Sequence, residues 1–87
     1  MARVFIPPAL RPLTDGQEAV EVPGATVAEV IENLNLRFPG TKDRLCSKGS
    51  LRPGMSVVIG AAVSALGLLQ HVAPDAEVHF LPSIGGG

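Results

Sequence analysis

The sequence ends in three consecutive glycines, Gly85, Gly86 and Gly87, preceded by Ile84. A terminal carboxylate, whose pKa is about 3.5, is anionic at neutral pH and therefore a poor electrophile. It reacts only after it is joined to a good leaving group such as AMP, which requires an ATP-using enzyme. Glycine has no Cβ. A glycine tail can therefore enter a narrow channel of an enzyme and adopt backbone dihedral angles that other residues rarely adopt. The pattern favours a carboxyl group activated by another protein, and the alternative is an inert, frayed end.

Other reactive side chains are few. Cys46 is the single cysteine, so no internal disulfide can form, and a reducing cytoplasm fits it best. It can relay sulfur or cross-link to an enzyme, or it can be incidental. His71 and His79 lack metal-ligand spacing, so we expect surface or sheet-edge histidines and no metal site.

The 87 residues carry a net charge of −1, without the basic excess of a dedicated nucleic-acid binder. Five of the seven basic residues nevertheless gather between positions 37 and 52, opposed there only by Asp43. This cluster can steer the protein to an acidic partner, or it can be a solvated loop. Its members are Arg37, Lys42, Arg44, Lys48 and Arg52. The apolar stretch at 55–69 is shorter than the ~20 residues that cross a bilayer, so we expect no membrane partner.

The spacing of apolar residues predicts one helix and several strands. Alternation at 3–6 and at 19–22, around a turn at 14–16, predicts a β-hairpin. Thr26 and Glu29 have the spacing of a capping box, and the apolar stripe after them predicts a helix ending at Pro39-Gly40. Strands are expected at 55–59 and 77–81. A chain this small has one core, so these elements favour a two-layer α+β domain at 1–82.

The expected first and last strands have two faces. One face carries core residues, namely Val4, Ile6, Val78 and Phe80. The opposite face exposes apolar residues that we expect to bind a partner protein. These residues are Phe5, Pro7 and Leu81, and Pro82, which ends the last strand, completes the interface candidates.

Over its full length the chain resembles the MoaD/ThiS family of sulfur carriers. The resemblance lies in the hairpin opening at 3–6, the turn at 14–16, the helix start at 26–29, and the strand and glycine tail at 77–87. It implies a ubiquitin-like β-grasp fold, with a mixed sheet of four to five strands and one main helix across it. Residues 83–87 are then a flexible glycine-rich tail.

The resemblance also implies a function for the tail. An E1-like enzyme would use ATP to adenylate Gly87, and sulfur from a persulfide or sulfide would convert the adenylate to a thiocarboxylate. Gly86 would complete the diglycine, and Gly85 and Ile84 would extend its reach. The chain would be a co-substrate that binds no cofactor, and it would pass its sulfur to a synthase or a large subunit.

Three readings stay open at this level. The length and the Phe80-Leu81-Pro82 ending favour the small subunit of molybdopterin synthase, although carriers for cysteine or thiamin pathways look alike. A second reading is a ubiquitin-like modifier joined through Gly87 to lysines of target proteins. A third is a β-grasp interaction module whose tail is inert.

Overall fold

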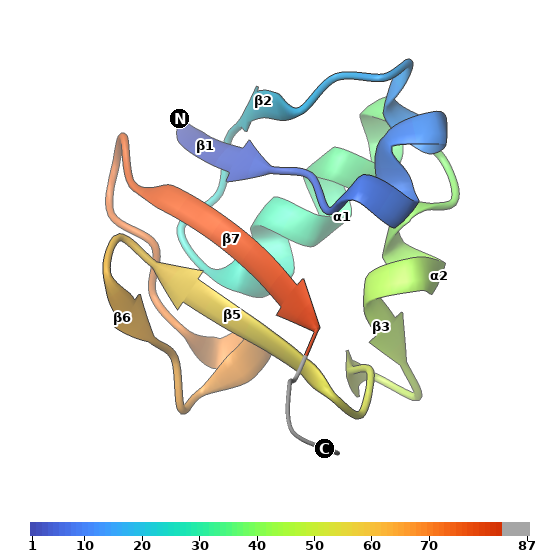
Figure 1. The fold of residues 1–87 in the computed structure, drawn as a ribbon. Coiled ribbons are helices and arrows are strands. Elements are labelled where there is room, and N and C mark those ends of the chain that lie inside the picture. Colours follow the sequence, from blue (N-terminus) through green and yellow to red (C-terminus); the bar gives the residue numbers. More distant parts are fainter. Residues whose placement is uncertain (83–87) are drawn as a thin grey trace.

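The computed structural model describes residues 1–82, with the backbone alone for Pro82. Its centre is a mixed five-stranded sheet in the order β2-β1-β7-β5-β6 (Figure 1). Strand β7 pairs in parallel with β1 and antiparallel with β5, so the last strand of the chain lies in the middle of the sheet. The strands are β1 (Ala2–Phe5), β2 (Ala19–Val22), β5 (Met55–Ile59), β6 (Ala62–Val63) and β7 (Glu77–Pro82).

The predicted hairpin of β1 and β2 is confirmed, but its connection is longer than a turn. A 3-10 helix, η1 (Pro8–Thr14), comes after β1 and leads into the turn. Proline has no backbone N–H to donate to a strand ladder and fits the first turn of a helix, so Pro7 and Pro8 end the strand. Asp15 and Gly16 then turn the chain with φ of 55° and 78°.

Helix α1 (Val27–Arg37) begins at the predicted cap. The Glu29 backbone N–H donates to Thr26 Oγ1 at 3.2 Å. The Glu29 carboxylate accepts from the backbone N–H of Ala25 at 2.9 Å, one residue earlier than a standard capping box. The helix ends at Arg37, and its C-cap residue Phe38 comes directly before Pro39.

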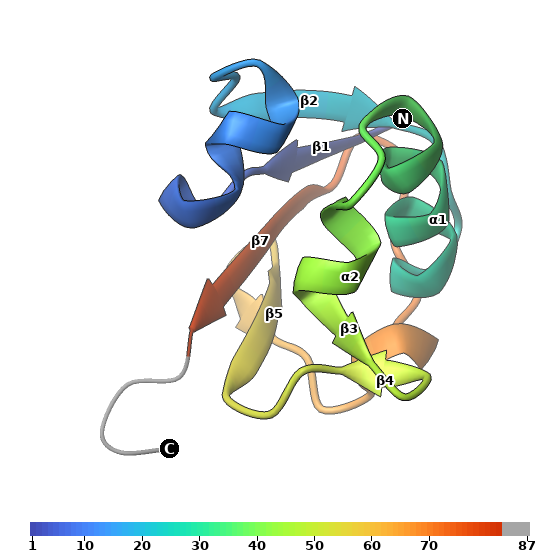
Figure 2. The same ribbon diagram turned by 90° about the vertical axis from the view of Figure 1, so that its right-hand side faces the viewer.

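The core lies between α1 and one face of the sheet (Figure 2). The helix buries its apolar stripe against alternate residues of the central strands, as their spacing predicts. Fully buried side chains come from α1 (Val27, Val30, Ile31, Leu34) and from the strands (Val4, Val22, Val57, Val78, Phe80).

Residues 41–69 contain short elements that the sequence pattern predicts only in part. The first is the short helix α2 (Thr41–Leu45), whose Leu45 is fully buried. A two-stranded hairpin of β3 (Cys46–Ser47) and β4 (Ser50–Leu51) comes next, in place of the expected polar loop. The 3-10 helix η2 (Gly67–Leu69) packs beside α1 and β4.

The parallel pairing of β1 and β7 fixes which end of the sheet leads to the tail. The first residues of both strands lie at one end, and their last residues at the other. At this second end Met55 pairs with Pro82. Everything beyond Pro82 therefore starts beside the beginning of β5 and the residues just after β1.

Candidate functional site

The outer face of the sheet carries the predicted interface near the last residues of β1 and β7. Phe5 and Pro7 are half-buried and Leu81 is 47% exposed, whereas Val4, Ile6 and Phe80 are buried on the other side. The predicted orientation of these two sets is therefore confirmed. Pro82 lies in β7 by its backbone. Whether these residues contact a partner stays a prediction.

His79 belongs to this outer face, which the sequence analysis did not foresee. It sits opposite Phe5 in the parallel register, and the two rings stack with centroids 4.2 Å apart and planes 4° from parallel. The Arg3 guanidinium lies 5.9 Å from the centroid of the Phe5 ring. Of the two places expected for a histidine, surface or sheet edge, His79 takes the surface, because β7 has a strand on each side and its side chain is 32% exposed. The signal was present, since Phe5, His79 and Leu81 share one strand face.

A shallow depression of about 210 Å³ joins this face to the residues after β1. Its lining is mostly apolar, with one guanidinium and one imidazole. The residues are Phe5, Ile6, Pro7, Pro8, Arg11, His79, Phe80 and Leu81. Arg11 is held there, because its Nε donates to the carbonyl of Ile6 at 3.2 Å and its Nη2 lies 4.0 Å from Glu18. The surface can bind apolar and aromatic groups, and its imidazole is engaged by a carboxylate, since His79 Nε2 lies 3.7 Å from Glu77.

The predicted reacting residues Gly86 and Gly87, with Gly85 and Ile84, lie outside the described residues. The structure does fix the strand from which they leave. Because β7 is central, the tail starts from the middle of the sheet and not from a loose edge.

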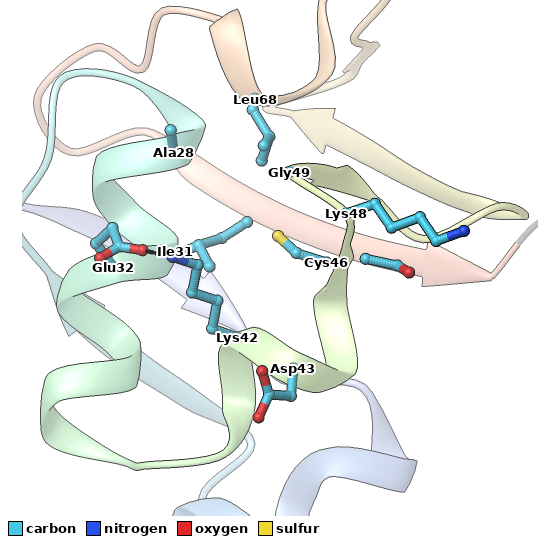
Figure 3. Close-up of a pocket in the computed structure, with 10 residues that line it drawn as sticks. Ala28, Ile31, Glu32, Lys42, Asp43, Cys46, Lys48, Gly49 and Leu68 are labelled. Atoms are coloured by element: carbon cyan, nitrogen blue, oxygen red, sulfur yellow. Dashed lines mark hydrogen bonds and ion pairs between the residues drawn. The ribbon is translucent and has the colours of Figure 1, made fainter.

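Cys46 lines a different depression, of about 380 Å³, between α1, α2 and the β3–β4 hairpin (Figure 3). It is half-buried and packs against the core, with its sulfur pointing toward α1. Burial raises the pKa of the Cys46 thiol, and the Lys42 ammonium only partly opposes this. Since the thiolate is the reactive form, the environment makes Cys46 less reactive and favours the incidental role.

The basic cluster divides into two parts. Lys42 forms an ion pair with Glu32 across the Cys46 depression (Figure 3), and Arg37 donates to the carbonyl of Glu21 at 3.2 Å. Arg44 and Arg52 instead lie together near the start of β5. The sequence shows the cluster but not this division, which depends on how α2 folds back.

Two further observations concern the class of site. Within residues 1–82 no three His, Cys, Asp or Glu side chains come together as metal ligands. The same part of the chain has no helix long and apolar enough to cross a bilayer.

Comparison with known proteins gives the family. No family model matches the chain. The sulfur carrier protein CysO of Mycobacterium tuberculosis is 33% identical over 97% of this chain and 96% of its own length, and the protein of that name in Mycobacterium bovis matches equally. The chain belongs to the CysO family of sulfur carrier proteins. The resemblance to MoaD/ThiS-like carriers is thereby confirmed.

Solved structures agree with this assignment. A chain in the crystal structure of the Amycolatopsis orientalis BexX/CysO complex superposes with a TM-score of 0.91 at 32% identity, and both chains are covered completely. Mycobacterium tuberculosis CysO gives 0.88 at 30% identity, over 97% of this chain and all of its own. The small archaeal modifier protein SAMP1 of Methanosarcina acetivorans gives 0.79 at 22% identity over 99% and 95%, which shows a common fold.

These neighbours confirm the predicted β-grasp fold with its mixed five-stranded sheet. They lend no specific support to the preference for a molybdopterin synthase subunit, since the relatives named are CysO proteins.

Proposed function

We propose that this protein carries sulfur as a thiocarboxylate on Gly87 and donates it to cysteine synthesis. The observation that carries the proposal is the full-length match to CysO sulfur carriers in a chain that ends in Gly85-Gly86-Gly87. The domain at 1–82 serves as a body that presents the tail at 83–87 to other proteins. The chain acts as a co-substrate, and its partners perform the chemistry.

Two steps load the sulfur. In the first, a Gly87 carboxylate oxygen attacks the α-phosphorus of ATP and pyrophosphate leaves, in the active site of an E1-like adenylating enzyme. In the second, hydrosulfide attacks the carbonyl carbon of the acyl adenylate and AMP leaves, so that one oxygen is replaced by sulfur. A persulfide donor would additionally need a thiol to reduce the acyl disulfide that it forms.

The molecule's contribution is to position the tail. Strand β7 pairs with β1 as far as His79 and with β5 as far as Pro82, so the β5 ladder holds the strand up to the start of the tail. The outer face beside that root, with Phe5, Pro7 and Leu81, is the surface that we expect the partner to contact, together with Pro82 at the end of β7. His79 belongs with them because its ring stacks on Phe5.

The test uses ATP–pyrophosphate exchange by the E1-like adenylating enzyme of the same host. Deleting Gly86 and Gly87 should abolish exchange. It should leave the thermal midpoint of unfolding unchanged, because the domain at 1–82 is not altered. Gly86→Ala should slow exchange at least about tenfold, because a Cβ narrows the dihedrals open to the tail. Ser83→Ala, farther from the reacting carboxyl group, is the control. Exchange that continues at the wild-type rate after the deletion contradicts the proposal and favours the interaction module.

The alternative function, a protein modifier, would pass through the same acyl adenylate at Gly87. It differs in the product, an amide between Gly87 and a lysine of another protein, which appears as high-mass adducts that retain the tail.

A further inference from the structure

A groove of about 370 Å³ opens at the tail end of the sheet and adjoins the outer face at Pro7. Most of the residues that line it are apolar, and two are arginines. The lining is Pro7, Ala9, Leu10, Arg44, Arg52 and Met55. Met55 is the residue that pairs with Pro82, so the groove lies beside the root of the tail.

The two guanidinium groups are available to a ligand. Arg44 and Arg52 are exposed, and in the part of the chain that the structure describes neither forms an ion pair with a carboxylate. Arg52 Nε donates to the backbone carbonyl of Asp43 at 3.1 Å. This bond orients the guanidinium and leaves its two terminal nitrogens for an external acceptor. Arginine binds carboxylates through two parallel hydrogen bonds.

The charge is distributed unevenly along the strands. At the end of the sheet away from the tail, the carboxylates of Glu21, Asp75 and Glu77 line a depression with the Arg3 guanidinium and the Met1 ammonium, whose nitrogen lies 3.9 Å from Asp75. The net charge of −1 hides this separation. An acidic partner surface would be attracted to the two arginines at the tail end, and the partly compensated carboxylates at the other end offer it no such attraction, so the charge distribution favours an approach at the tail end.

We propose that this arginine groove docks acidic side chains that border the tail entrance of the adenylating enzyme. The inference rests on the proposed function, and the adenylating enzyme is chosen because it acts on Gly87 whichever pathway receives the sulfur. The five residues after Pro82 span at most about 17 Å, so an enzyme that takes in Gly87 must bring its surface close to the groove. Carboxylates would pair with Arg44 and Arg52, and apolar parts of the same side chains would rest on Leu10 and Met55.

The experiment compares two double charge reversals in ATP–pyrophosphate exchange. Arg44→Glu/Arg52→Glu alters the groove, and Arg37→Glu/Lys48→Glu makes the same change in net charge at exposed residues outside it. At about 0.05 M salt we expect the groove variant to raise KM for the carrier at least about tenfold with kcat unchanged, and the control to change KM less than about twofold. At about 0.5 M salt the wild-type KM should rise toward that of the groove variant, because salt screens the attraction. Circular dichroism and thermal midpoints establish that both variants fold.

Arg44→Gln/Arg52→Gln should give an intermediate KM, because it removes the attraction without adding repulsion. A groove variant whose KM equals that of the control, or whose kcat falls while KM stays constant, overturns the inference and leaves the proposed function standing. Absence of exchange with the wild-type chain overturns the proposed function, and the inference falls with it.

Discussion

The two faces of the central sheet are made by the same strands but by different kinds of side chain. On the inner face Val4, Val78 and Phe80 are at most 1% exposed and pack under α1. On the outer face Phe5 and His79 stack on each other, and Leu81 stands 47% exposed. Neighbouring residues of a strand therefore alternate between the core and the surface.

The comparison shows which residues folding requires and which it leaves free. An inner face of aliphatic residues and one phenylalanine satisfies the need to bury apolar area. The outer face gains little stability from Leu81, yet it keeps aromatic and apolar groups beside the tail root. Half-buried Phe5 and Pro7 and exposed Leu81 lie together there, and such a group of accessible apolar side chains can serve as a binding surface.

The largest predicted effect is a difference in the free energy of unfolding between substitutions at two adjacent residues of β7. Phe80→Ala should lower the free energy of unfolding by about 3–5 kcal/mol, because it removes a buried ring and leaves a cavity. Leu81→Ala should change it by less than about 1 kcal/mol, since the side chain is about half exposed. Urea unfolding measures both. Equal losses would show that the outer face is also a packed core.

A second prediction concerns the entry of α1, which covers the inner face. Gly24 has a φ of +153°, and a Cβ there would lie 2.8 Å from the backbone nitrogen of Val30. Gly24→Ala should cost about 2 kcal/mol or more through strain and crowding. Gly60→Ala, at φ +63° with nothing within 4 Å of its Cβ, isolates the cost of the dihedral alone and should be milder. Equal thermal midpoints for the two variants would contradict the close approach of the chain to α1.

A third prediction sharpens the contrast by separating stability from function on the outer face. Phe5→Ala should cost only about 1 kcal/mol, because it loses the ring stacking with His79 and part of a half-buried side chain. It should nevertheless raise KM in the exchange assay roughly tenfold, as expected for an aromatic residue central to an interface. Leu36→Ala, at an exposed apolar residue of α1, is the control and should leave KM unchanged. Equal KM values for the two variants would remove the outer face from the docking surface.

The sequence predicted the regular parts of this molecule because their signals are local. The cap at Thr26, the stripe along α1 and the alternation of Val78 and Phe80 each depend on spacing within a few residues. The connection through η1 was missed because prolines mark the end of a strand but do not determine the next element. The β3–β4 hairpin was missed because two strands of two residues have no periodicity to detect.

The candidate site was predictable in composition but not in arrangement. Phe5 and Leu81 could be named from alternation, whereas the stacking of His79 on Phe5 requires the parallel register of β1 and β7. The grouping of Arg44 and Arg52 with Met55 depends on contacts between segments distant in sequence. Long-range pairing of this kind leaves no trace in local pattern.

The most direct test of the account is the intact mass of the protein purified from its own host, with sequencing of its C-terminal peptide. The account predicts a population heavier by the replacement of one oxygen by one sulfur, with the change located at Gly87. A sulfur adduct located at Cys46 instead, or a tail that is never modified while the pathway is active, would contradict it.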